Sequence, residues 1–255
     1  MESAAGLLQF QSGGSALLNA RLKNVATRFL PGFLLRRLDP IQDIIESEVR
    51  EAASLLSDKH TVLDAGAGEA RHRQYFTRGR YIALDAGRGD AAWDYSRLDV
   101  LGNLESLPFR SHSVDRVLCM VVLEHTRNPR AVLGEFARVL KRGGTLYLVV
   151  PLLWEEHQTP HDYFRFTRYG MQYLFEGLPF DVDRLEPMGG LFWVCARRCV
   201  NLLSVFQGGW RWLAFVLLAP FLGFLFPIAL YFLDPLDRDK RFSLGFRIRA
   251  SRKGD

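Results

Sequence analysis

Gly66 and Gly68 are the most chemically informative residues of this sequence, because they directly follow the apolar residues 62–63 and the carboxylate of Asp64. Glycine has no Cβ, so the chain can turn tightly there and a ligand can approach the backbone. A helix expected over residues 69–76 would point its N-terminal amides at the same ligand. The pattern predicts a nucleotide-type site at the end of a buried strand.

The residues around this turn argue against a dinucleotide. A dinucleotide-binding turn has a third glycine three residues after the second, and here that position is Arg71. Asp64 would also repel a pyrophosphate. A cationic ligand would be attracted instead, and S-adenosylmethionine carries an ammonium and a sulfonium group but no phosphate.

Two further carboxylates follow in the order that a nucleoside requires. Asp85 ends a second apolar run at residues 81–84. It stands roughly 20 residues after the turn, where a carboxylate can accept from both ribose hydroxyls. Asp99 comes after another short interval, and its carboxylate can accept from an adenine amino group. We therefore expect Asp64, Asp85 and Asp99 to gather around one nucleoside.

Residues 154–167 are dense in groups that move protons or bind polar molecules. The candidate catalytic residues in this segment are His157, His161, Tyr163 and Arg165. Either histidine could act as a base on a hydroxyl group, and Arg165 is suited to a carboxylate or phosphate. His161 is favoured over His157 because it adjoins Asp162, which could fix its tautomer.

Two other interpretations of this segment stay open. Its polar side chains could serve only structural hydrogen bonds. His157, His161 and Asp162 could also bind a metal, but Pro160 makes one continuous helix through them improbable on steric grounds. The sequence therefore predicts no metal ligand, and catalysis or acceptor binding is the favoured role.

The chain resembles the class I S-adenosylmethionine-dependent methyltransferases, especially the branch of ubiquinone and menaquinone biosynthesis enzymes. The resemblance covers about residues 60–178 and rests on the glycine turn and on five further blocks in order, at residues 104–109, 113–118, 123–125, 138–144 and 146–151. It implies an α/β fold, a doubly wound and mostly parallel seven-stranded sheet whose last strand is antiparallel. The implied cofactor is S-adenosylmethionine.

The resemblance adds three residues to the expected cofactor site. These are Val100, Cys119 and Glu124. Cys119 lies in an apolar run and also fits a buried strand residue. Glu124 and His125 form a second candidate pair near the methyl-transfer end, although Glu124 could equally cap the next helix or bond to a loop amide.

Alternating apolar patterns predict the elements that position these residues. Strands are expected near residues 61–64, 81–84, 115–121, 145–150, 180–186 and 241–250, and helices near 69–76, 129–140 and 167–177, with another beginning at Asp39 and Pro40. Such alternation indicates a parallel sheet with helices on both faces, and ligands then bind beyond the carboxyl ends of the strands.

The chain is expected to have four parts. They are basic amphipathic N-terminal helices at residues 1–58, a cofactor-binding core at 59–190, a hydrophobic insertion at 191–240, and a last strand with a basic tail at 241–255. A basic amphipathic segment at residues 15–38 fits either a membrane surface or a helix that covers the sheet.

Residues 212–233 form an uncharged run that is long enough to span a bilayer. Pro220, Gly223 and Pro227 interrupt it, and basic residues stand on both sides. If residues 241–250 return to the sheet, the run must end where it began. We therefore expect a shallow helix–break–helix wedge at the cytoplasmic side of a membrane, monotopic or re-entrant. A core helix, a dimer interface and a single membrane-spanning helix are the alternatives.

The composition agrees with one such domain and its additions. The chain has 255 residues, a net charge of +5 and only three cysteines, which suits a reducing compartment. No nucleic-acid recognition motif is visible, so we expect no nucleic-acid partner.

The sequence thus predicts an enzyme that transfers a methyl group to a small-molecule or lipid-linked acceptor at a membrane surface. Two alternatives are a soluble-substrate methyltransferase that is only tethered to the membrane, and a membrane-associated protein that binds the cofactor without turnover. A nucleotide-dependent oxidoreductase is disfavoured by Arg71 and Asp64. The acceptor and the oligomeric state are left open.

Overall fold

The structure, a computed structural model, describes residues 40–54, 56–89, 93–206 and 209–254. The expected amphipathic segment at residues 15–38 and the helix cap at Asp39 lie outside these residues. The chain divides into two compact units. Among the described residues, one unit holds 45–186 and 245–254, and the other holds 40–44 and 187–244.

The larger unit is built on one seven-stranded sheet. Its strands are β1 (Thr61–Ala65), β2 (Arg80–Asp85), β3 (Val100–Leu101), β4 (Val114–Met120), β5 (Leu140–Pro151), β6 (Phe180–Pro187) and β7 (Gly245–Arg252). They lie in the order β3-β2-β1-β4-β5-β7-β6. The strands from β3 to β5 are parallel, and β7 is antiparallel to β5. This confirms the predicted doubly wound, mostly parallel fold.

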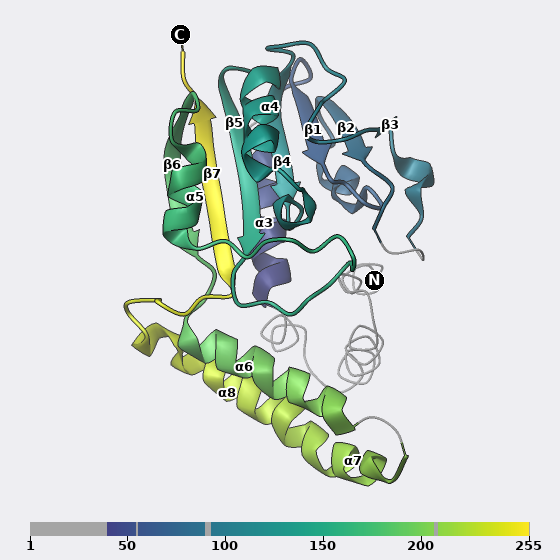
Figure 1. Cartoon of the computed structure of the whole chain (residues 1–255), viewed down its shortest axis with the longest axis vertical. Helices are drawn as coiled ribbons and strands as arrows, with labels where there is room; N and C mark the ends of the chain where they lie inside the picture. Colours follow the sequence, from purple (N-terminus) through teal and green to yellow (C-terminus); the bar gives the residue numbers. More distant parts are fainter. Residues whose placement is uncertain (1–39, 55, 90–92, 207–208, 255) are drawn as a thin grey trace. The chain divides into compact units, whose positions relative to one another are not determined.

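Helices cover both faces of this sheet. The helices α4 (Pro129–Val139) and α5 (Arg168–Phe175) lie on one face, and α3 (Pro40–Ser54) lies behind the other (Figure 1). Side chains of α4 and α5 share a buried apolar cluster with alternate residues of β1, β4, β5 and β7. Strands with both faces covered read as continuous apolar runs, which is why the sequence pattern located them.

Local sequence signals set the helix starts. Asn128 caps α4 by accepting from the amide of Ala131 at 3.1 Å, and Pro129 occupies the first helical position. Thr167 caps α5 by accepting from the amide of Gly170 at 3.0 Å. Side-chain oxygens at these positions satisfy amides that have no partner within the helix.

The expected helix over residues 69–76 is wrong in its type and length. The structure has a 3₁₀ helix, η1 (Arg71–Tyr75), that lasts only five residues. Ala70 adopts a left-handed conformation with φ 53°, and its amide bonds to the carbonyl of Ala67 in a tight turn. A regular α-helix cannot begin through such a residue, so the glycine turn lacks the expected helix N-terminus.

The smaller unit contains a helical hairpin. One arm is α6 (Leu191–Leu202), and the other runs through α7 (Trp212–Pro220), the π-helical turn η6 (Phe221–Leu225) and α8 (Phe226–Leu233). Trp193 of α6 stacks on Tyr231 of α8 with ring centroids 5.2 Å apart. The arms thus run side by side (Figure 1).

Two aspartates join the ends of the arms. Asp234 is buried and accepts from the amides of Gly190 and Trp193 at 2.9 and 3.3 Å, and Lys240 forms an ion pair with it. Asp237 accepts from the amide of Leu191 at 2.7 Å. Both therefore cap α6 from the far arm, so the hydrophobic segment returns to the place where it began.

The expected break at residues 220–227 does not occur. The helical run from Gly209 to Leu236 is continuous, with 28 residues. A π-helical turn directly follows Pro220 and accommodates its missing amide, and Pro227 lies in the first turn of α8. By length and apolar composition alone, this run could cross a membrane.

We expect Asp234→Ala to loosen the start of α6. The substitution leaves the amide of Gly190 without its acceptor, and an unsatisfied buried group costs about 1–3 kcal/mol. Hydrogen exchange of the Gly190 and Trp193 amides should quicken by roughly tenfold to a hundredfold. Asp239→Ala is the matched control, because Asp239 is largely exposed and pairs only with Arg241 among the described contacts. Equal exchange in both variants would contradict this capping role.

Candidate active site

The glycine turn after β1 is shaped by close contacts. Gly66 has φ 85°, and a Cβ there would lie 2.3 Å from Cγ1 of Val122, which follows β4. Gly68 has φ 52° and faces the ring of Trp93. A side chain would overlap Val122 at the first position and crowd Trp93 at the second, so glycine suits both. The contact with Val122 also places the turn beside the residues that follow β4.

Asp85 joins the end of β2 to this turn. Its Oδ2 accepts from the amide of Gly68 at 3.0 Å, and its Oδ1 accepts from the amide of Gly87 at 2.8 Å. The carboxylate is thus held at the carboxyl edge of the sheet, beside the backbone that a ligand would approach. This is the place that the sequence assigns to a ribose diol.

The structure gives Asp64 and Asp99 partners within the protein. Asp64 is buried, its Oδ2 accepts from the hydroxyl of Tyr81, and the same oxygen lies 2.9 Å from Nδ1 of His72. Oδ2 of Asp99 accepts from the amide of Ala83 at 2.7 Å and from Arg73 at 2.6 Å. Their predicted contacts with the cofactor stay predictions.

Val100 and Cys119 are placed differently. Val100 is half-buried at the start of β3, where it pairs with Leu84 of β2. Cys119 is fully buried in β4, and its side chain belongs to the apolar core. Burial raises the pKa of the Cys119 thiol well above its ordinary value, so this cysteine is an inert core residue.

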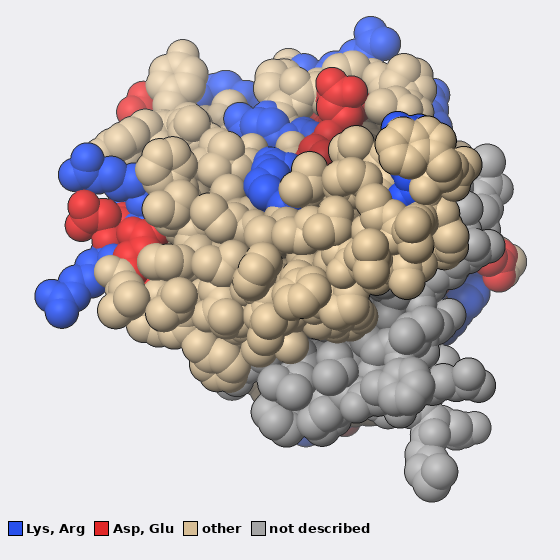
Figure 2. Space-filling view, turned by 90° about the horizontal axis from the view of Figure 1, so that it is seen from below, with Lys and Arg blue, Asp and Glu red and all other residues tan. Residues whose placement is uncertain are grey.

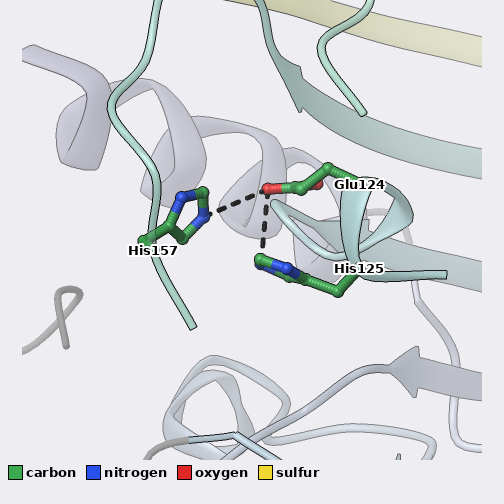
Figure 3. A group of neighbouring side chains, drawn as sticks. All are labelled: Glu124, His125 and His157. Carbon is green, nitrogen blue, oxygen red and sulfur yellow. Dashed lines mark ion pairs between the residues drawn. The ribbon is translucent and has the colours of Figure 1, made fainter. Parts of the chain in front are cut away.

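Glu124, His125 and His157 form a compact cluster beyond β4 and β5 (Figure 3). Glu124 and His125 lie in the 3₁₀ helix η3 (Leu123–His125), and His157 comes from the loop after β5. Oε1 of Glu124 is 3.7 Å from Nε2 of His125 and 3.5 Å from Nε2 of His157. Glu124 is completely buried.

Backbone bonds fasten the loop after β5 to this cluster. The carbonyl of Glu124 accepts from the amides of Tyr163 and Phe164 at 2.9 and 3.3 Å. Just before η3, Val121 has φ 58°, which is a strained conformation for a β-branched residue. Strain of this kind persists where the surrounding structure holds a functional geometry.

The two histidines have opposite electrostatic settings. For His125, burial lowers the pKa and outweighs the attraction of Glu124, so the net shift is downward. For His157, burial also lowers the pKa, but the attraction of the nearby Glu124 carboxylate outweighs it and the net shift is upward. Two titratable groups whose environments push their pKa values apart are typical of a catalytic centre.

Arg165 is bonded entirely within its own loop in this structure. Its guanidinium donates to both oxygens of Asp162, at 2.6 and 2.7 Å, and to the carbonyls of Trp154, Glu155 and Phe164. An arginine has five N–H donors, and these five bonds use all of them. Arg165 therefore organises the loop and has no donor left for a substrate carboxylate or phosphate.

Asp162 also departs from the expected arrangement. It accepts from the amide of His157 at 2.9 Å, and its Oδ2 lies 3.5 Å from Nδ1 of that residue. His161 instead bonds to the hydroxyl of Tyr163 at 2.9 Å. Asp162 thus faces His157 rather than fixing the tautomer of His161. His161 is half-buried and Tyr163 is exposed, so this hydrogen-bonded pair is the polar pair of the loop nearest to solvent.

The sequence did not assign a role to two residues that the structure brings to the site, His72 and Tyr81. His72 and Tyr81 hold Asp64, and Trp93 faces Gly68. Neither His72 nor Tyr81 has a motif around it, so only the fold shows their roles. Tyr81 begins the second apolar run, and the alternation of side chains along a strand is the one sequence signal that could have indicated which face it occupies.

Comparison with known proteins gives a family match in the core. Residues 63–148 match the family described as "Methyltransferase domain". A biotin biosynthesis bifunctional protein from Cellvibrio japonicus is 35% identical over 100 residues. That match covers 36% of this chain and only 20% of the relative.

Similar solved structures share the fold at low identity. A methyltransferase dependent on S-adenosylmethionine from Archaeoglobus fulgidus has a TM-score of 0.53 and 12% identity, covering 82% of this chain and 94% of its own. A chain from a complex that contains the Haloferax volcanii Trm112 methyltransferase activator has a TM-score of 0.52 and 18% identity, covering 96% of this chain and 100% of its own. The [4+2]-cyclase SpnF, at 0.52 and 18%, covers 83% of this chain and 80% of its own. This fold therefore also carries a cyclase.

Proposed function

We propose that this chain, which contains a methyltransferase domain at residues 63–148, transfers a methyl group from S-adenosylmethionine to a small-molecule or lipid-linked acceptor at a membrane surface. The observation that carries the proposal is the shared edge of the sheet. The glycine turn, Asp85 and the cluster of Glu124, His125 and His157 all follow the carboxyl ends of parallel strands. Ligands of such sheets bind at that edge.

The cofactor is S-adenosylmethionine. Gly66 and Gly68 give it access to the backbone, and Asp85 accepts from its ribose hydroxyls. The sulfonium already activates the methyl group, so the protein must chiefly position the acceptor and exclude water. In the reaction, a nucleophilic oxygen, nitrogen or carbon forms a bond to the methyl carbon. The electrons of the broken C–S bond return to sulfur and leave a neutral thioether.

The helical hairpin supports action at a membrane. The helical run from Gly209 to Leu236 exposes large apolar side chains, among them Trp210 at 88%, Leu213 at 69% and Leu217 at 63%. Figure 2 shows a broad area without charged side chains and charged residues gathered toward its margins. Exposed apolar patches of this kind mark membrane or protein contacts.

The same hairpin favours a monotopic attachment over a membrane-spanning one. Arg197 and Arg198 lie in the middle of α6, and a central charge costs about 2.5–3.5 kcal/mol in a spanning helix. The caps from Asp234 and Asp237 also return the chain to the end of the hairpin where it began. The proposed location is therefore the cytoplasmic side of a membrane.

The decisive experiment identifies the product. The full chain is incubated with S-adenosylmethionine that carries a labelled methyl group and with a native lipid extract or its water-soluble fraction, and labelled products are detected by mass spectrometry. Label in a lipid supports the proposal as stated, and label only in the water-soluble fraction supports a methyltransferase that is merely tethered. Cofactor binding without label in either fraction would favour the non-catalytic binding protein.

We expect His161→Ala and Tyr163→Phe to lower turnover while cofactor affinity stays close to normal. His161 is half-buried and Tyr163 is exposed on the loop after β5, the two side chains bond to each other, and general acid–base groups contribute typically about 10²–10⁴-fold. Turnover and calorimetric cofactor affinity should be measured on the same preparations. Full activity in both single variants and in a double His157/His161 alanine variant would refute a catalytic role for the loop.

A further inference from the structure

The cluster of Glu124, His125 and His157 contains three electron-pair donors that face one another. Nδ1 of His125 lies 2.9 Å from the carbonyl oxygen of His161, and Nδ1 of His157 lies 3.1 Å from that of Glu155. A carbonyl oxygen only accepts, so each Nδ1 must carry the hydrogen. The neutral rings then turn Nε2 lone pairs toward the carboxylate of Glu124.

No donor within the described residues satisfies this group. Both carboxylate oxygens of Glu124 and the Nε2 atoms of the two histidines are buried without a hydrogen-bond partner. Glu124 has no exposed surface, and His157 is 8% exposed. Burying a carboxylate without compensation is costly. The arrangement is thus electrostatically incomplete unless a cation or an extra proton lies among these atoms.

The geometry and chemistry of the cluster fit a metal ion. One ligand atom from each residue lies within 4.8 Å of the others. A small movement of these side chains toward one another would place all three atoms about 2.0–2.2 Å from a central zinc ion, which is the usual length of a bond to zinc. The Nδ1 bonds to carbonyls are the second-shell contacts that orient metal-binding histidines. Asp162 stands behind both rings, 4.0 Å from Nδ1 of His125 and 3.5 Å from Nδ1 of His157.

We propose that Glu124, His125 and His157 bind one divalent transition-metal ion whose remaining coordination positions take a hydroxyl group of the methyl acceptor. Two imidazoles and one carboxylate form a donor set that suits zinc and related ions better than magnesium or calcium. Three protein ligands leave coordination positions open for a substrate.

The proposed binding of the acceptor hydroxyl to the ion rests on the proposed function. A hydroxyl bound to the ion loses its proton to water more readily, because the cation stabilises the alkoxide or phenolate. The oxygen then forms the bond to the methyl carbon, while the C–S bond breaks toward sulfur. The contact between Gly66 and Val122 brings the cofactor turn close to this place in the chain.

The test measures zinc binding directly. The full chain is freed of metal with a chelator, and Zn²⁺ affinity is determined by competition with a fluorescent indicator. We expect one Zn²⁺ per chain, and at least a hundredfold weaker binding in Glu124→Gln, His125→Ala and His157→Ala. His112→Asn is the matched control: it removes an imidazole that precedes β4, at the opposite end of that strand, and asparagine tolerates its φ of 57°.

Circular dichroism and thermal unfolding of the metal-free proteins report whether each variant is folded. Co²⁺ in place of Zn²⁺ provides a second readout, because its visible absorption reports histidine ligation. A wild-type chain that binds no Zn²⁺ would overturn the proposed site. An extra proton shared among Glu124, His125 and His157 would then explain how these buried groups are satisfied. Binding that persists in all three cluster variants would place the ion elsewhere and also overturn it.

A separate measurement tests whether the acceptor hydroxyl binds to the ion. If a chelator abolishes methyl transfer and Zn²⁺ restores it, with cofactor affinity unchanged, the acceptor binds to the ion as proposed. Equal turnover with and without Zn²⁺ would show that the ion does not bind the acceptor, and the zinc site itself would still be supported by the titrations. If no acceptor is ever methylated, the proposed function fails, whereas the zinc titrations still establish or reject the site.

Discussion

Replacing Asp85 with alanine should weaken the binding of S-adenosylmethionine by about tenfold to a hundredfold. Its carboxylate is held at the end of β2 by the amides of Gly68 and Gly87, and each oxygen can accept a further bond from a ribose hydroxyl. A hydrogen bond to a charged group contributes about 1.5–3 kcal/mol, and 1.4 kcal/mol corresponds to a tenfold change in affinity. Calorimetric titration with the cofactor measures the loss.

Two further variants separate ribose binding from support of the turn. Asp85→Asn keeps one carbonyl oxygen for the turn, so its loss of affinity should fall between those of the wild type and the alanine variant. Asp58→Ala is the matched control, because Asp58 is an exposed aspartate that precedes β1 and pairs with Arg78. Unchanged affinity in Asp85→Ala, with a folded protein, would remove the ribose assignment.

The sheet could be predicted from the sequence because its information is local. Strands β1, β2, β4 and β5 contain residues buried on both faces, so each is visible in the sequence as an apolar run. Caps such as Asn128 and Thr167 also act within three residues of the amides they bind. Such signals need no knowledge of distant partners.

The site could be predicted only in part because its contacts are distant in sequence. Glu124 and His157 meet only when the loop after β5 folds back over η3. The residue next to His161 in sequence, Asp162, bonds to Arg165 and His157 instead. Adjacency in sequence therefore gave the wrong partner for the tautomer of His161.

The hairpin illustrates the same limit in the smaller unit. Its apolar composition is visible in the sequence, but its caps are not, because Asp234 binds the amide of Gly190 across 44 residues. The prolines were misleading for a physical reason. A π-helical turn can absorb a missing amide without ending the helix, so Pro220 marks a local widening and not a break.

Removing the apolar side chains of one face of the hairpin should release the protein from membranes. Leu213, Leu217 and Phe221 are spaced four residues apart on one helical face and are 69%, 63% and 48% exposed. Burying one such side chain contributes about 1.5–3 kcal/mol. The triple serine variant should therefore lose at least about a hundredfold in partitioning onto vesicles that contain anionic lipids.

The matched control removes exposed aromatic residues from the larger unit. Tyr169 and Tyr173 lie on α5 and are 78% and 66% exposed, so Tyr169→Ser with Tyr173→Ser should leave partitioning unchanged. Vesicle co-sedimentation measures both variants. If the wild-type protein is released from native membranes by high salt or carbonate, its apolar face is not inserted, and an interface between protein chains would explain that face instead.

The orientation of the hairpin can be tested in intact cells. Single cysteines are placed at Arg211→Cys, at the start of the second arm, and at Asp239→Cys, beyond its end, in a chain whose three native cysteines are replaced by serine. A monotopic hairpin keeps both sites on the cytoplasmic side, so a membrane-impermeant thiol reagent should label neither until the cells are opened. Labelling of one site from outside would establish a true crossing by residues 209–236. Such a crossing is difficult to reconcile with the caps that Asp234 and Asp237 provide to α6, so the two-site experiment tests the folded hairpin and its membrane attachment together.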